Sequence, residues 1–164
     1  MGAGISYVKT KTSVNTGHPV SVIYGSGYFN GMTHCDEYHN SFTPSVGTIY
    51  TDTVTLGKGL TITKQSIGVA NISGGFTGFD GILGIGPVDL TQGTQPKEPT
   101  AEILTVTQNL FLQKDISEMV VAVSFEPSKG LHVTNGELTF GGTDSTKYTG
   151  HIAYVWVTLL SLRV

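Results

Sequence analysis

The sequence has little of what several functional classes require. Its 164 residues include a single cysteine, Cys35, so no internal disulfide bond can form. Only 13% of the residues are charged, and nine Lys and Arg against twelve Asp and Glu give a formal net charge of −3. Because the Lys and Arg residues are scattered singly, no basic face is expected to neutralise phosphates, and nucleic acid is not an expected partner.

Long apolar runs are also missing. No stretch approaches the length of a membrane-spanning helix, so no membrane partner is expected. The first residues, Met1 to Ser6, lack a basic segment followed by a long apolar run, which predicts that this chain carries no secretory signal peptide. The length suffices for one domain with a core of its own.

Glycine, threonine and serine are abundant instead. The 22 glycines and the many β-branched residues favour turns and pleated strands, so the sequence predicts an all-β domain. Two hairpins are expected in the first half of the chain. One pairs residues 20–24 with 28–29 across a turn at 25–27, and the other pairs residues 49–56 with 60–70.

One helix and further strands are expected later in the chain. Residues 82–85 form a short apolar run between glycines, which predicts a buried strand where backbones approach closely. Residues 100–112 are the best helix candidate, with the first of them as the N-cap. A strand over 120–125 then pairs with 138–140 in a hairpin around Asn135-Gly136, a strong turn signal.

Three glycine-punctuated motifs follow one another along the chain. They are Tyr24-Gly25-Ser26-Gly27, then Phe79-Asp80-Gly81-Ile82-Leu83-Gly84-Ile85-Gly86, then Gly136-Glu137-Leu138-Thr139-Phe140-Gly141-Gly142-Thr143-Asp144-Ser145 followed by Tyr148-Thr149-Gly150. Neither an Asp-Thr-Gly nor an Asp-Ser-Gly triplet occurs. One such motif is weak evidence for a protein family, but three motifs in this order are specific evidence.

In order and spacing, these motifs resemble the pepsin-like aspartic proteases, most closely the secreted fungal acid proteases of the polyporopepsin type. The resemblance covers about residues 6 to 154. It implies a partial N-terminal lobe of the bilobal, β-barrel-like acid protease fold, with one or two short helices. The implied domain division is a lobe over 1–154, interrupted by an insertion at 32–48, and a divergent tail at 155–164.

The resemblance also implies a catalytic mechanism for which this chain lacks the residues. In the family, two aspartates from two lobes share a proton and hold the attacking water, each within an Asp-Thr/Ser-Gly loop. The candidate carboxylates, Asp52, Asp80, Asp89 and Asp144, do not fit that pattern. No catalytic residue is therefore predicted, and the family needs no metal or organic cofactor.

The substrate-binding residues implied by the resemblance are present. Tyr24 matches the flap tyrosine, and Gly25, Ser26 and Gly27 match the flap tip, which pairs with an extended peptide. Phe79 and Ile82 match the wall of an apolar pocket for a substrate side chain. The plainer alternatives are an ordinary hairpin turn for the first group and core packing for the second.

Two other motifs are present. The run His34-Cys35-Asp36-Glu37-Tyr38-His39 offers metal-binding side chains. It lacks a second pair of Cys or His residues at the spacing of a zinc site. A solvated loop is therefore the preferred interpretation, and no metal is predicted. Asn71-Ile72-Ser73 is an N-glycosylation sequon, usable only if the chain enters the secretory route.

The function predicted is that of a fragment of an aspartic endopeptidase, a family whose members are secreted and cut internal peptide bonds at acid pH. The fragment is expected to be a monomer, to have peptide or protein substrates as partners and to be inactive alone. A first alternative is a non-catalytic β module that binds extended apolar peptides. A second is a chain that folds poorly, because unpaired sheet edges and apolar surface are left uncovered.

Overall fold

A computed structural model describes residues 6–24, 27–30, 47–74, 79–128, 130 and 133–155. Strands dominate it, with one α-helix and two short 3-10 helices, η1 (Val88–Thr91) and η2 (Ser145–Lys147). This composition confirms the predicted all-β class with short helices. No helix of the described residues is long and apolar enough to cross a membrane.

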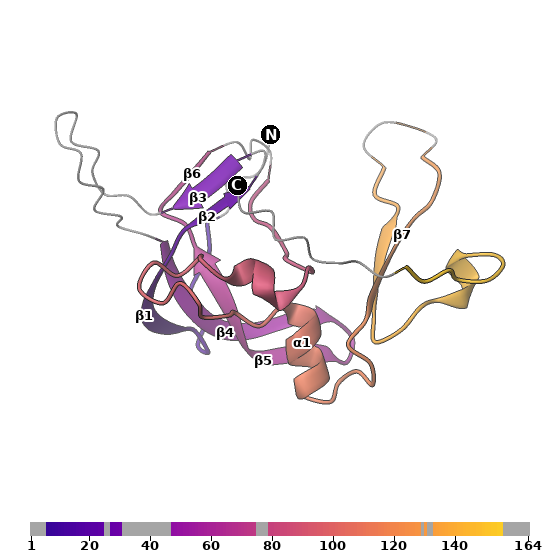
Figure 1. The fold of residues 1–164 in the computed structure, drawn as a ribbon, viewed down its shortest axis with the longest axis horizontal. Coiled ribbons are helices and arrows are strands. Elements are labelled where there is room, and N and C mark those ends of the chain that lie inside the picture. Colours follow the sequence, from indigo (N-terminus) through magenta and orange to yellow (C-terminus); the bar gives the residue numbers. More distant parts are fainter. Residues whose placement is uncertain are drawn as a thin grey trace.

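The first sheet is antiparallel with the strand order β1-β4-β5 (Figure 1). It consists of β1 (Val14–Val20), β4 (Gly47–Gly57) and β5 (Leu60–Val69). The register of β4 and β5 runs from Thr48↔Val69 to Gly57↔Leu60, which confirms the second predicted hairpin. Gly59 closes its turn at φ +79, a conformation that glycine adopts without steric cost.

The second sheet holds the first predicted hairpin, except that Val20 lies in β1 and Gly27, predicted in the turn, lies in β3. Its strand order is β2-β3-β6, with β2 (Val22–Tyr24), β3 (Gly27–Asn30) and β6 (Ile72–Gly74). Each of the two pairings is antiparallel. The predicted return strand at 28–29 is therefore confirmed, and it gains a second neighbour from a segment more than 40 residues further along the chain.

The helix is shorter than predicted. α1 spans Val106–Leu112, and its N-cap is Thr105 rather than Thr100. The Thr105 side chain accepts from the Gln108 N–H, while the Gln108 side chain accepts from the Thr105 N–H, which together form a capping box. Because this box bonds two of the N–H groups that lack an intrahelical partner, the helix starts there and residues 101–105 stay outside it.

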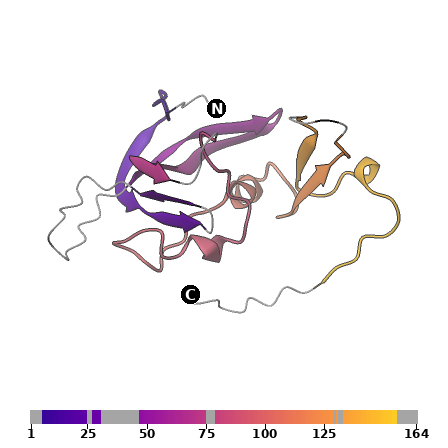
Figure 2. The same ribbon diagram turned by 90° about the horizontal axis from the view of Figure 1, so that it is seen from above.

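The core lies where α1 packs against the first sheet (Figure 2). Its buried side chains come from β5, from the helix and from the bend after it: Ile62, Val106, Leu110 and Ile116. Ile62 and Leu110 are fully buried. Partly buried apolar side chains surround them: Leu56, Leu60, Ile85 and Phe140.

A third, two-stranded sheet projects beyond the helix (Figures 1 and 2). β7 (Val121–Phe125) pairs with β8 (Gly136–Phe140), which confirms the predicted hairpin. The predicted turn position is wrong, because Gly136 already lies in β8 opposite Phe125. The connection instead runs from 126 to 135, and the Glu126 N–H bonds the Asn135 carbonyl at its base.

Residues 82–85 are not a strand, which corrects another expectation. Ile82 is 52% exposed and Leu83 is 46% exposed, so only Ile85 of this run packs against the core. A Cβ placed on Gly81 or Gly84 would meet nothing within 4 Å. Close backbone approach therefore does not explain these two glycines.

Candidate peptide-binding site

The β2–β3 hairpin supplies the lid of the candidate site. Its register is Val22↔Phe29, Ile23↔Tyr28 and Tyr24↔Gly27, so the pairing continues to the last strand residue on each side. A two-residue connection is the commonest hairpin geometry. Gly25 and Ser26 lie outside the described residues, as does the Tyr24 side chain, so their substrate-binding roles stay predictions.

Strand β6 orients the chain toward the tip of this hairpin. Gly74 lies opposite Tyr28, whereas Ile72 lies opposite Asn30, so the chain leaves β6 at the end nearer the tip. Phe79 follows Gly74 by five residues, which span at most about 18 Å when fully extended. Phe79 therefore lies no further than this from Gly74, and its place beside the lid stays a prediction.

Phe79 and Ile82 both lie at the surface. Their exposed fractions are 74% and 52%, so core packing describes neither side chain. Together with half-exposed Leu83 they form a short apolar segment open to solvent. Exposed apolar groups of this kind suit contacts with an apolar partner, although their role in a substrate pocket remains a prediction.

Asp52 is the most strongly bonded carboxylate of the described residues. It lies in β4 and is only 2% exposed. Its oxygens accept from four hydroxyl groups and one backbone N–H: Tyr7 at 2.7 Å, Thr10 at 2.7 Å, Ser13 at 2.6 Å, Thr12, and the Thr53 N–H at 2.8 Å.

These bonds decide what Asp52 can do. The Ser13 hydroxyl, then those of Thr12, Thr10 and Tyr7, hold the pKa of the Asp52 carboxyl well below its usual range. A carboxylate has about four acceptor sites, and five donors already occupy them. Asp52 therefore anchors the 7–13 segment to β4 and has no acceptor site left to activate a water.

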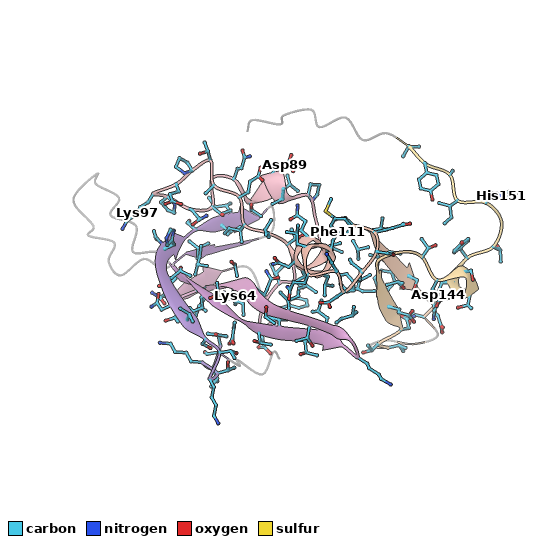
Figure 3. All side chains as sticks on the ribbon, turned by 90° about the horizontal axis from the view of Figure 1, so that it is seen from below. Lys64, Asp89, Lys97, Phe111, Asp144 and His151 are labelled. Carbon is cyan, nitrogen blue, oxygen red and sulfur yellow. The ribbon has the colours of Figure 1, made fainter. Side chains whose placement is uncertain are left out.

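Asp144 and Asp89 also have no catalytic geometry. Asp144 accepts from the Thr146 N–H at 2.8 Å and its hydroxyl at 2.7 Å, which caps η2 and lowers the pKa of the carboxyl. Asp89 lies in η1, in a different part of the molecule (Figure 3). Two carboxylates must lie almost in contact to share a proton, and these two do not.

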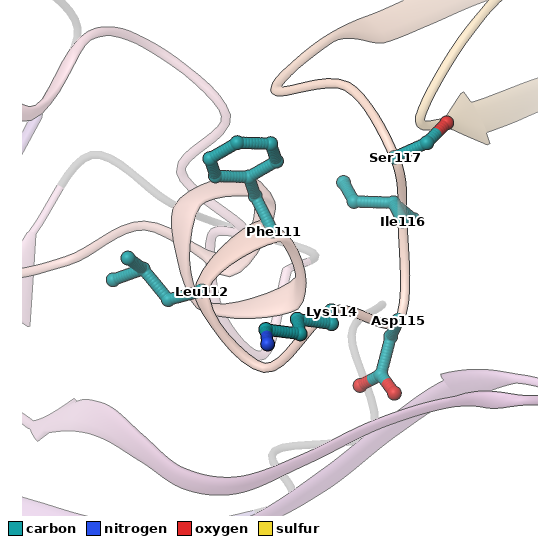
Figure 4. Close-up of a pocket in the computed structure, with 6 residues that line it drawn as sticks. All are labelled: Phe111, Leu112, Lys114, Asp115, Ile116 and Ser117. Carbon is teal, nitrogen blue, oxygen red and sulfur yellow. The ribbon is translucent and has the colours of Figure 1, made fainter.

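Two hollows on the surface are separate from the predicted residues. One lies at the end of α1, lined by Phe111, Leu112, Lys114, Asp115, Ile116 and Ser117 (Figure 4). The other is more polar and includes His18, Lys64 and Gln95. Within the described ranges no group of three or more His, Cys, Asp or Glu side chains could hold a metal ion, and His34 to His39 lie outside those ranges.

Comparison with solved structures defines the class of fold. The structure resembles the crystal structure of the aspartic proteinase from Irpex lacteus, with a TM-score of 0.83 and 54% sequence identity. The match covers 99% of this chain and 43% of that one. The fold is thus part of the pepsin-like aspartic proteinase fold, as predicted.

Sequence comparison gives the family. The model of the eukaryotic aspartyl proteases matches residues 37–161. Polyporopepsin of Irpex lacteus is 55% identical over 161 residues, which are 98% of this chain and 42% of that protein. Human cathepsin D is 30% identical over 156 residues, 92% of this chain and 34% of that protein. The chain belongs to the eukaryotic aspartyl protease family and spans less than half the length of these relatives.

Proposed function

We propose that this chain forms the flap-bearing part of an aspartic endopeptidase that hydrolyses internal peptide bonds at acid pH. Family membership supports the reaction class. The observation that carries the proposal is the β2–β3–β6 arrangement, in which the chain leaves β6 at the end nearer the hairpin tip and Phe79 follows Gly74 by five residues. The partner is a peptide or protein substrate, bound by a monomer.

The lid would hold its substrate by strand addition. An extended peptide offers a row of backbone donors and acceptors, and the exposed edge of a hairpin can pair with them. Apolar side chains of the peptide would then contact Phe79 and Ile82, which are accessible. Such contacts position a peptide without cutting it.

Hydrolysis requires groups that this chain lacks. The reaction needs one carboxylate to take a proton from water and a second to donate to the scissile carbonyl. Neither Asp-Thr-Gly nor Asp-Ser-Gly occurs in the sequence, and Asp52 is fully occupied. We therefore propose that residues 1–164 alone are inactive and that the activity belongs to a longer, secreted protein.

The test is proteolysis by the purified chain. A denatured protein substrate is incubated between pH 3 and 5 with and without pepstatin, and its fragments are separated by mass. We expect no pepstatin-sensitive cleavage, whereas a complete aspartic protease in the same buffer should degrade the substrate. Reproducible pepstatin-sensitive fragments from the chain would contradict the proposal, provided that circular dichroism shows folded β structure.

A second candidate function is binding without catalysis. The exposed Phe79 and Ile82 favour it, since a folded chain leaves them free for an apolar peptide. Titration calorimetry with an extended apolar peptide should detect saturable binding that Phe79→Ala weakens. Phe125→Ala is the matched control, because Phe125 on β7 is 76% exposed against 74% for Phe79. Equal losses from both variants would point to unspecific apolar contact.

A further inference from the structure

The chain contains one Asn-x-Ser/Thr sequon among its six asparagines, Asn71-Ile72-Ser73. We propose that Asn71 is an N-glycosylation site that is used when the chain enters the secretory route. The modification would attach an oligosaccharide to the side-chain amide nitrogen. Asn71 directly precedes β6, a strand of the sheet that carries the predicted lid, but the proposal depends neither on hydrolysis nor on peptide binding.

The fold presents Asn71 as an acceptor on a surface bend. β5 ends at Val69 and β6 begins at Ile72, so Asn71 lies in the short connection between two sheets. Its side chain is exposed. An N-linked glycan is bulky and soluble and needs this kind of position, because it cannot be accommodated within a packed core.

The register also places the glycan away from the lid. Ile72 lies opposite Asn30 at one end of β3, and Gly27 at the other end pairs with Tyr24 beside the hairpin tip. Three residues of strand, about 10 Å, separate these ends. Asn71 precedes Ile72 and therefore lies beyond the far end. The attachment point is thus at the end of the strand opposite the lid, and on this ground we expect glycosylation and peptide binding to be compatible.

The experiment measures glycan transfer on the full chain. Residues 1–164 are preceded by a cleavable secretory signal and translated with endoplasmic-reticulum microsomes, and only protease-protected chain is analysed. We expect one added glycan, removed by an endoglycosidase. Asn71→Gln and Ser73→Ala should abolish it, whereas Ser73→Thr should retain it because threonine also completes the sequon.

A gain-of-site variant checks the transfer machinery. Gln92→Asn creates an Asn-Gly-Thr sequon at another exposed position. In the protected fraction this variant should carry one glycan more than the parent chain. An unmodified parent chain beside a modified Gln92→Asn variant would overturn the proposal, as would a glycan that persists in Asn71→Gln.

The placement of the glycan away from the lid is tested separately, by peptide binding. Glycosylated chain and endoglycosidase-treated chain should bind an extended apolar peptide with affinities that agree within about twofold. A large gain in affinity after glycan removal would overturn the placement but leave the modification itself intact. If neither form binds the peptide, the proposed peptide site fails, while the mass shift still decides the glycosylation.

Discussion

Asp52 ties the first described residues of the chain to the middle of β4. The donors that reach it from residues 7–13 lie 39 to 45 positions away in the sequence. The sequence predicted the strand and showed that Asp52 lacks the catalytic loop. It could not predict the anchor, because hydroxyl groups scattered over a Thr- and Ser-rich segment carry no periodic signal.

Removing the Asp52 carboxylate should destabilise the chain more than removing any one of its donors. Ser13→Ala deletes one hydrogen bond and should cost about 1 kcal/mol. Asp52→Ala leaves every donor without its acceptor and should cost several times as much. Urea denaturation followed by circular dichroism measures both, and equal losses would show that the other donors contribute little.

The lowered pKa of Asp52 predicts how stability depends on pH. Because the folded-state pKa lies below the unfolded value of about 3.9, the bonded carboxylate contributes its full stability above that pH. The contribution then falls as the pH drops below about 4. The stability difference between the parent chain and Asp52→Asn should thus be constant from pH 7 to 5 and shrink toward pH 2, as measured by urea titrations. A constant difference down to pH 2 would contradict this assignment.

At the scale of elements, hairpins were predicted better than the helix boundary. Period-two alternation located β4–β5 and a glycine turn located β2–β3, whereas the strands β7 and β8 were predicted with their turn misplaced. The helix start was misplaced by five residues, although Thr105-Val106-Thr107-Gln108 fits the capping-box pattern and marks the true start. The pairing of β3 with β6 was not predicted, because short strands from distant segments leave no local pattern.

The two leucines of α1 should differ sharply in their effect on stability. Leu110 is fully buried in the core, whereas Leu112 is 61% exposed. Leu110→Ala should cost about 2–5 kcal/mol through lost burial and the cavity left behind. Leu112→Ala should cost less than about 1 kcal/mol. Chemical denaturation of the two variants is the measurement, and similar losses would place the core elsewhere.

The β7–β8 hairpin should open more readily than β4–β5. Val123 and Phe125 are 50% and 76% exposed, and among the described strands β7 and β8 pair only with each other. A two-stranded ribbon with so little burial is marginal in water. Hydrogen exchange by mass spectrometry should show amide protection at least about tenfold lower in β7–β8 than in β4–β5. Equal protection would mean that the hairpin is stabilised by contacts other than those described.

At the scale of the whole molecule, the described residues leave several large apolar side chains exposed. The chain spans 42% of polyporopepsin and leaves Phe79, Ile82 and Phe125 exposed. The sequence pattern assigned the apolar run at 82–85 to a buried strand, yet only Ile85 packs against the core. An apolar run between glycines does not itself specify a partner strand, and residues 82–85 are not in a strand.

The central claim is that the hairpin lid and the Phe79–Ile82 segment belong to one peptide-binding site. Photo-crosslinking tests it most directly, with an extended apolar peptide that carries a photoreactive group at each end and with the labelled positions identified by mass spectrometry. If the lid and this segment form one site, one peptide should label residues 24–27 and 79–82 together, and unlabelled peptide should compete for both. Labelling confined to the hollow at the end of α1, or spread over β7–β8, would contradict the claim.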